Sequence, residues 1–296
     1  MCVAGLSTAM LRTILIPVRG DGKGEGALDH ALALGRRFNA HLQVIHCRQR
    51  PQDMLPFGGM VSAALRQQVV SSATSLADEE ERRVKALFED YCRRTDIAVV
   101  ERPRDAPRDR PSASWSEATG QQAAVVGIRG RMTDVIAVAQ PDHRLNIGFR
   151  TLEAALLETG QLVLLCPPLP ATEIGRHVAI AWSGDAEAAA AVAAALAILG
   201  AADRVTVLSA RTGAPLDLAP EQLSDHLATH GIDATIETFD ARPHAVAQGL
   251  LAAAKTAAAD VLLMGAYGHD RRRELVMGGV TKHITDHADL PVLLRG

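Results

Sequence analysis

The chain contains one pattern twice: an apolar run, a Gly-Asp turn, an Ala- and Leu-rich helix and a second apolar run. The first copy begins at Ile14 and the second at Val178. Apolar runs that alternate with helices are typical of parallel sheets covered by helices on both faces. The pattern therefore predicts two tandem α/β domains. The apolar runs span residues 14–18 and 41–46 in the first copy and residues 178–182 and 204–209 in the second.

Further apolar runs complete a sheet in each half. We predict two doubly wound domains, each with a mostly parallel five-stranded sheet flanked by helices. Prolines between Pro167 and Gly175 predict the boundary, because proline cannot donate to a strand ladder. With a cut near residue 170, the domains span residues 1–170 and 171–296. The additional runs span residues 113–117, 135–139 and 163–165 in the first half and residues 234–238, 261–264 and 292–294 in the second.

Composition excludes several classes of protein. Of the 296 residues, 48% are apolar, and the formal net charge is −3, which is typical of a soluble globular protein. Only 3% are aromatic and the basic residues are dispersed, so we expect no nucleic-acid partner. No apolar run is long enough to cross a bilayer and no basic signal-peptide start is present, so we expect no membrane association. The four widely spaced cysteines indicate reduced thiols, as in a cytoplasmic protein.

A glycine-rich loop near the end of the chain predicts an anion site. It follows the apolar run that ends at Met264, and a predicted helix follows it at Thr281. Glycines allow backbone N–H groups to approach a ligand, and the start of a helix adds unpaired N–H groups and a positive dipole end. This combination suits a phosphate group. The glycines of the loop are Gly265, Gly268, Gly278 and Gly279.

The spacing of these glycines, with the run from His287 to Leu294 after them, resembles the signature of the universal stress protein (UspA-like) family. The resemblance implies the adenine nucleotide alpha hydrolase-like fold and a stress-response module that binds ATP or another adenine nucleotide, with or without Mg²⁺. It also implies that the final strands of the two domains pair, so that the chain forms an internal pseudo-dimer. The resemblance covers the second half more strongly than the first.

The resemblance assigns a nucleotide site to the second domain but no catalytic residue and no metal ligand. Two positions depart from the family pattern, because Gly279 replaces a Ser or Thr, and Ser183 replaces an Asp. Loss of one hydroxyl bond to a phosphate costs about 1.5–3 kcal/mol, so we expect weak or moderate binding. Asp185 either substitutes for the missing carboxylate or caps a helix. The implied site residues are Ser183, Asp185, Val207, Leu208, Ser209, Met264, Gly265, Gly268, Gly278, Gly279, Val280 and Thr281.

The first domain lacks the glycines at the corresponding positions. Alignment of the strands places Ala139 opposite Gly265 and Asp142 opposite Gly268. Side chains and a carboxylate therefore occupy positions where a triphosphate needs bare backbone. We expect this site to be lost. Phe149 and Arg150 likewise stand opposite Gly278 and Gly279.

Two other functions remain open. The first is a nucleotide-independent scaffold that acts through contacts with a protein partner or a second copy of the chain. The second is a slow ATP hydrolase with Asp270 or Glu274 as the active carboxylate. The cations from Arg271 to Arg273 either clasp phosphates or lie in solvent.

Several weaker motifs are also present. Gly22-x-Gly24-x-x-Ala27 partly matches a dinucleotide fingerprint, but no P-loop occurs. Two pairs of histidines four residues apart match helical metal-site spacing but lack an obvious third ligand. Cys47 follows His46 on a predicted strand, so the two side chains are expected on opposite faces. The histidine pairs are His226 with His230 and His283 with His287.

Overall fold

The computed structural model describes residues 11–19, 24–48, 63–142, 144–171, 173–213, 215–242, 245–266 and 279–296. Strands and helices alternate in both halves, as predicted. The first half consists of β1 (Thr13–Val18), α1 (Gly24–Phe38), β2 (His41–Arg48), α2 (Ala63–Arg94), β3 (Ala98–Val99), the 3₁₀ turn η2 (Pro103–Asp105), β4 (Ser112–Thr119), α3 (Gln122–Arg129), the 3₁₀ turn η3 (Gly130–Met132), β5 (Val135–Ala139), α4 (Phe149–Glu158) and β6 (Leu162–Cys166).

The second half repeats this order without a counterpart of β3. Its elements are β7 (His177–Trp182), α5 (Ala186–Ala194), α6 (Leu196–Gly200), β8 (Arg204–Arg211), α7 (Pro220–Thr229), β9 (Ala234–Asp240), α8 (Val246–Thr256), β10 (Val261–Gly265), α9 (Gly279–His287) and β11 (Val292–Arg295). The segment between β6 and β7 contains the predicted boundary near residue 170, which stays a prediction.

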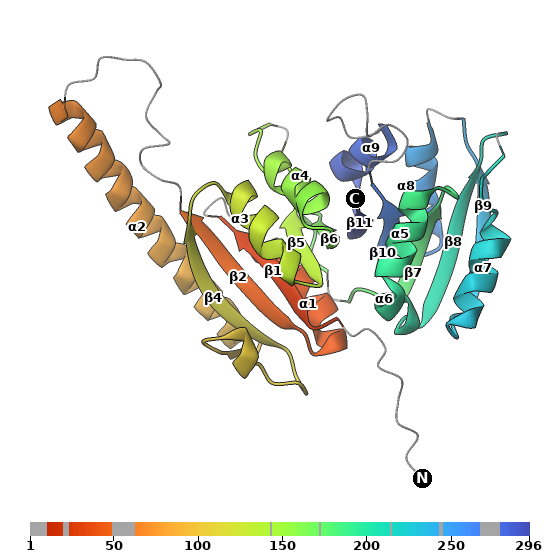
Figure 1. Ribbon diagram of the computed structural model, residues 1–296, viewed down its shortest axis with the longest axis horizontal. Coiled ribbons are helices and arrows are strands. Elements are labelled where there is room, and N and C mark those ends of the chain that lie inside the picture. Colours follow the sequence, from red (N-terminus) through yellow and green to blue (C-terminus); the bar gives the residue numbers. More distant parts are fainter. Residues whose placement is uncertain are drawn as a thin grey trace, which may run out of the picture.

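The strands form one sheet in the order β3-β4-β2-β1-β5-β6-β11-β10-β7-β8-β9. All pairs within each half are parallel. The two halves meet where β6 pairs antiparallel with β11, with Leu164 opposite Leu293. This pairing confirms the predicted tandem α/β fold with the final strands of both halves side by side (Figure 1).

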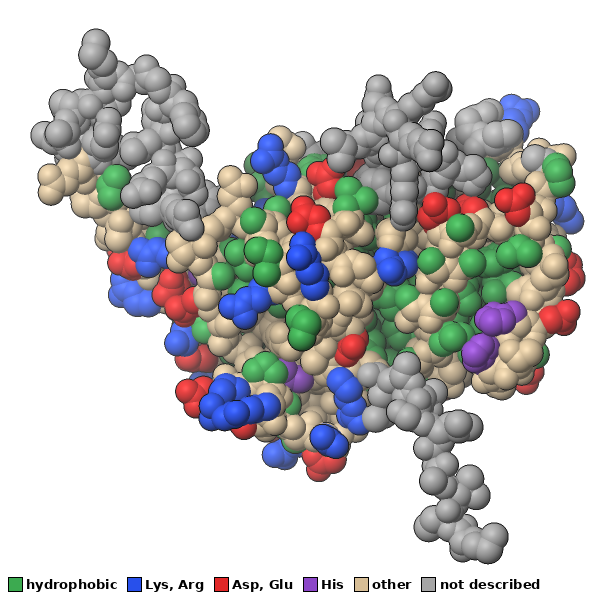
Figure 2. Space-filling view, in the orientation of Figure 1, with side chains coloured by type: hydrophobic (Ala, Val, Ile, Leu, Met, Phe, Trp, Pro, Cys, Tyr) green, Lys and Arg blue, Asp and Glu red, His purple; other side chains and the backbone are tan. Residues whose placement is uncertain are grey.

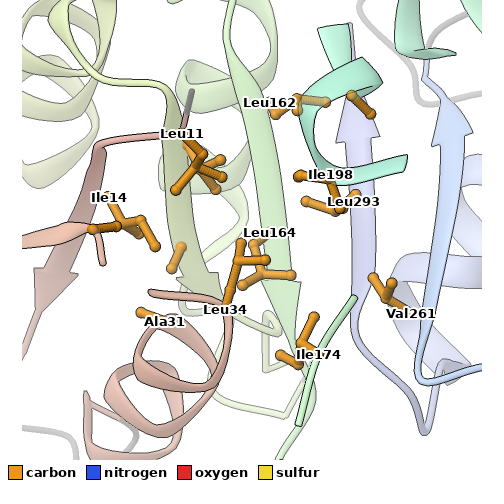
Figure 3. Close-up of a cluster of buried hydrophobic side chains, with 14 of the residues drawn as sticks. Leu11, Ile14, Ala31, Leu34, Leu162, Leu164, Ile174, Ile198, Val261 and Leu293 are labelled. Carbon is orange, nitrogen blue, oxygen red and sulfur yellow. The ribbon is translucent and has the colours of Figure 1, made fainter. Parts of the chain in front are cut away.

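Helices cover both faces of the sheet (Figure 1). One face packs against α1, α2, α5, α6 and α7, and the other packs against α3, α4, α8 and α9. The first of these cores continues across the junction of the halves, where Leu34 of α1, Leu164 of β6 and Ile198 of α6 gather with Leu293 of β11 (Figure 3). Because burial of each such side chain stabilises the fold by about 1.5–3 kcal/mol, the junction is an apolar core rather than a flexible hinge.

Polar contacts add two further links between the halves. On one face, Arg37 of α1 donates to the carbonyl of Ala201 and lies 3.2 Å from the carboxylate of Asp203. On the other face, the side-chain amide of Gln140, which follows β5, donates to the backbone of α9.

Two details of the fold differ from prediction. The Ala- and Leu-rich helix expected after the second Gly-Asp turn is broken into α5 and α6 at Ala195, whose backbone (φ −96°, ψ 4°) leaves the helical region. The first half also contains the two-residue strand β3, beside β4. The pattern predicts neither detail, because alanines continue through the break and two residues are too few to show an alternation.

The long helix α2 runs beside the first half, and its N-terminal end extends past the sheet (Figure 1). Charged side chains of both signs gather over the segment that precedes β4 (Figure 2), where most residues are exposed. Within the described ranges, no helix is long and apolar enough to cross a membrane.

Candidate functional site

A pocket of about 350 Å³ lies at the carboxyl ends of β7, β8 and β10. The strand order reverses between β7 and β10, and ligands of doubly wound folds bind at such a switch point. The volume lies within the usual range for small-molecule sites, about 300–1,000 Å³. The pocket is lined by Ala181, Trp182, Ser183, Asp185, Leu208, Ala210, Phe239, Val246, Leu250, Met264, Gly265, Gly279, Val280 and Thr281.

The structure brings most of the predicted site residues together in this pocket. Gly268 and Gly278 lie outside the described residues, as do Asp270, Glu274 and the arginines from Arg271 to Arg273. The predicted residues that line the pocket are Ser183, Asp185, Leu208, Met264, Gly265, Gly279, Val280 and Thr281.

Val207 and Ser209 are not among the residues that line the pocket, and the assignment of these two positions to the site stays a prediction. Val207 is fully buried in the core on the other face of the sheet, and both residues pair with β7 and β9. The ladder with β7 ends at Ser209, whereas β8 continues to Arg211. Because the carbonyl of Arg211 accepts from Ala241 on the β9 side, the N–H and C=O of Ala210 point past the end of β7, toward the pocket.

Asp185 acts as the N-cap of α5. Its Oδ1 accepts a hydrogen bond from the backbone N–H of Ala188 at 2.8 Å, and Ser183 Oγ donates to its Oδ2 at 2.8 Å. Such a cap stabilises a helix by about 1 kcal/mol. The structure therefore supports the structural role of Asp185, and the hydroxyl of Ser183 is bonded to the same carboxylate.

The two described glycines of the site differ in their surroundings. A Cβ atom added to Gly265 would lie 2.5 Å from the carbonyl carbon of Glu187 and 2.7 Å from the backbone nitrogen of Ala188. Gly265 is thus required where α5 crosses the end of β10. Among the described atoms, none lies within 4 Å of a Cβ atom on Gly279, so these atoms leave room for a side chain there.

Sequence reasoning missed the apolar wall of the pocket, which is formed by Trp182, Phe239, Val246 and Leu250. The indole N–H of Trp182 donates to the carbonyl of Leu218 at 2.9 Å. The ring of Phe239 lies against α8 at a glycine, because a Cβ atom on Gly249 would lie 2.7 Å from its Cε2. Two features of the sequence could have indicated this wall. They are Trp182, a rare residue type at the end of a strand, and Gly249, a glycine inside a helix.

The corresponding pocket of the first domain has a volume of only about 20 Å³. Arg19, which follows β1 as Ser183 follows β7, fills it. Its Nε donates to Gln122 Oε1 at 2.5 Å and its Nη2 to Thr151 Oγ1 at 3.2 Å. The hydroxyl of Thr151 donates to the same oxygen of Gln122 at 3.0 Å. This pocket is too small for a nucleotide. A separate pocket of about 520 Å³ lies beside it, lined by Gly26, Ala27, Ala139, Gln140, Pro141, Asp142, Arg144, Cys166, Pro167 and Pro168.

The loop between β5 and α4 of the first domain is also closed. Asp142 and Ile147 exchange two backbone hydrogen bonds, of 2.8 and 3.1 Å. The carboxylate of Asp142 accepts from the backbone N–H groups of Arg144 at 2.8 Å and Leu145 at 3.2 Å. The N–H groups of Asp142, Arg144, Leu145 and Ile147 are therefore bonded within the loop and are not free to hold an anion.

The described structure gives the histidine pairs and Cys47 no further support as functional groups. Among the residues described, no three His, Cys, Asp or Glu side chains cluster in a way that could hold a metal ion. The rings of His283 and His287 are stacked with centroids 4.2 Å apart, and His287 Nδ1 lies 3.0 Å from the carbonyl of His283. Burial raises the pKa of the Cys47 thiol to about 11, so this thiol is neutral near pH 7.

No family model and no curated protein matches this chain. A universal stress protein from Archaeoglobus fulgidus DSM 4304 superposes with a TM-score of 0.67 at 11% identity, over 96% of this chain and 97% of that chain. A candidate universal stress protein from Pseudomonas aeruginosa UCBPP-PA14 gives a TM-score of 0.55 at 17% identity, over 96% and 93%. The full-length match confirms the predicted resemblance at the level of the fold: this chain has the two-domain fold of the universal stress proteins.

Proposed function

We propose that the chain is a tandem universal stress protein that binds an adenine nucleotide in its second domain. The observation that carries this proposal is the contrast between the two switch-point pockets, of about 350 and 20 Å³. The larger pocket combines an apolar wall with the start of a helix, and these features suit a base at one end and phosphates at the other.

The base is assigned to the apolar part of the pocket. Phe239 and Leu208 offer a surface for its ring, and the N–H and C=O of Ala210 offer a donor and an acceptor for its edge. The phosphates are assigned to the first turn of α9, where Val280 and Thr281 line the pocket. Negative charge is favoured at this end of a helix by about 0.3–1 kcal/mol.

Binding is expected to be weak or moderate. Gly279 offers no hydroxyl group, and the hydroxyl of Ser183 is bonded to Asp185. Asp185 is also the one carboxylate among the described lining residues, and it caps α5. A binding module therefore fits the described part of the pocket better than an ATP hydrolase does.

The first test is to denature freshly purified protein and identify any released small molecule by mass spectrometry. We expect at most one adenine nucleotide per chain. Protein without nucleotide would then be titrated with ATP, AMP and GTP, with and without Mg²⁺. The two tryptophans of the chain serve as reporters, because Trp182 lines the pocket and Trp115 lies in the first domain.

The Trp115→Phe variant should show saturable quenching of Trp182 by an adenine nucleotide, with little response to GTP. The Trp182→Phe variant is the matched control and should show no response from Trp115. If no nucleotide is released and none binds up to millimolar concentration, the proposal is wrong. The nucleotide-independent scaffold would then be the better explanation of the fold.

A further inference from the structure

We infer that Gln140 of the first domain is a positioning residue for α9, the helix whose first turn lines the pocket of the second domain. Gln140 follows β5, and its Nε2 donates to the carbonyl oxygens of Thr285 at 2.9 Å and of Ala288 at 3.4 Å. The first domain thus holds the C-terminal end of a helix whose N-terminal end faces the proposed ligand.

The contact suits the end of a helix. The carbonyl groups of the last turn have no partner within the helix, so an N–H donor from outside satisfies them. Because both neighbours of the Gln140 amide are carbonyl oxygens, its NH₂ group must face them, and the orientation of the amide is fixed by chemistry. Gln140 therefore caps α9 from the other domain.

Gln140 is itself held rigidly. Its backbone N–H donates to the carbonyl of Cys166, the last residue of β6, at 2.8 Å. Pro141 restricts the backbone of Gln140 to extended conformations. Gly148 has φ +99°, and a Cβ atom there would lie 3.1 Å from the Cα of Pro141, so the far side of the loop packs tightly against its near side. The cap consequently stands on the closed loop that replaces a phosphate loop in this domain.

The first domain caps a helix of the second domain through Gln140, and the second domain has no equivalent glutamine. The position that corresponds to Gln140 in the second domain is Ala266, which is fully buried and has no polar side chain to reach α4. Helix α4 is capped instead within its own domain, where Thr159 Oγ1 donates to the carbonyl of Ala155 at 2.5 Å and accepts from the N–H of Gln161 at 3.2 Å. We therefore assign the first domain the role of a fixed support for the site in the second.

The part of this inference that concerns ligand affinity rests on the proposed function, whereas the part that concerns α9 does not. Hydrogen exchange measured by mass spectrometry on peptides from residues 279–296 tests the second part in the absence of nucleotide. In Gln140→Ala, amides of the last turn of α9 should exchange about fivefold faster, because one capping interaction is lost. Gln140→Lys keeps a donor near the last carbonyls and should restore most of the protection.

Arg37→Ala is the matched control, because Arg37 also crosses between the halves but contacts the loop before β8. It should lower the melting temperature without faster exchange in α9. Unchanged exchange of α9 in Gln140→Ala, or equally faster exchange in Arg37→Ala, would overturn the inference.

The affinity for adenine nucleotide should fall about two- to fivefold in Gln140→Ala and recover in Gln140→Lys. A faster-exchanging α9 with unchanged affinity would restrict the role of Gln140 to stability and overturn its role in positioning. If the unmodified protein binds no nucleotide, the proposed function fails, and the exchange experiment still decides whether Gln140 holds α9.

Discussion

The two halves of the chain have the same sheet order apart from β3 and differ at the carboxyl ends of the central strands. In the second half this end is an open pocket that Trp182 and Phe239 border. In the first half, Arg19 and its partners Gln122 and Thr151 occupy the same place. The comparison shows that this fold can lose a pocket without any change in its strands, because the residue after the first strand and one loop decide whether the pocket is open.

The comparison also separates two kinds of glycine. Gly265 is fixed by the packing of α5, whereas Gly279 is unconstrained among the described atoms. The first domain has Ala139 at the position of Gly265, so a Cβ atom is accommodated there. Four substitutions or conditions test these differences, in order of decreasing expected effect.

Gly265→Ala should destabilise the protein by about 3 kcal/mol, because its Cβ would overlap the backbone of Glu187 and Ala188. Nucleotide affinity should fall with it, since the end of β10 forms part of the pocket. Urea denaturation and titration would measure the two effects. The reverse change in the first domain, Ala139→Gly, should cost less than about 1 kcal/mol. Equal effects of the two substitutions would show that the halves pack alike here.

Acid should weaken the first domain before the second. Burial lowers the pKa of His41 to about 4, and its two ring nitrogens lie 2.9 Å from the hydroxyls of Ser112 and Ser114. The unfolded chain takes up this proton near pH 6.5 and the folded chain near pH 4, so stability is lost as the pH falls between these values. The loss should be about 2 kcal/mol, allowing for partial screening by solvent.

Urea denaturation of Trp182→Phe, followed through Trp115, would measure this loss in the first domain. In His41→Gln, the free energy of unfolding should depend less on pH across the same interval. Burial also lowers the pKa of His30, on α1, so a smaller dependence should remain. An identical pH dependence with and without His41 would contradict the assignment.

Gly279→Ser should strengthen nucleotide binding about tenfold, because it adds a hydroxyl donor where the described atoms leave space. Gly279→Ala has a similar effect on the backbone but adds no donor, so it separates the hydroxyl bond from helix propensity. Isothermal titration of the unmodified protein and both variants would measure the three affinities. A gain of the same size in Gly279→Ala would mean that helix order, rather than the hydroxyl, limits affinity.

Arg19→Ala should cost about 1 kcal/mol of stability, the typical value of a side-chain hydrogen bond, and should enlarge the first pocket. The number of nucleotides bound per chain should remain one, because Asp142 still occupies the N–H groups of the loop. Equilibrium dialysis with excess ATP would count them. Two nucleotides per chain would show that Arg19 alone closes the site.

Much of the fold was predictable from the sequence because parallel strands buried on both faces leave long apolar runs. The repeat of such runs predicted the two domains, whereas the central pairing of β6 with β11 was expected only from the resemblance to the universal stress proteins. The two-residue strand β3 and the break at Ala195 lack such a pattern. They depend on packing between elements that are distant in the sequence.

The candidate site was predictable only in part. The glycine-rich loop and the start of α9 were predicted from the sequence, because close approach of a ligand to the backbone requires glycine. The roles of Arg19 and Phe239 were not, because each depends on side chains that three different elements bring together. Ala210, whose backbone faces the pocket beyond the ladder with β7, lies one residue past the predicted range, since the end of a ladder depends on the length of the neighbouring strand.

The covalent connection between β6 and β7 has a consequence for how such a protein can change over generations. In an assembly of two identical chains, any residue at the position of Arg19 would appear in both pockets, and a closed pocket would be inherited twice. In this chain the two copies of the unit are encoded separately, although their strands β6 and β11 still meet as partners. One copy is therefore free to accumulate substitutions that strengthen its contact with the other, while the other retains the features of a binding site.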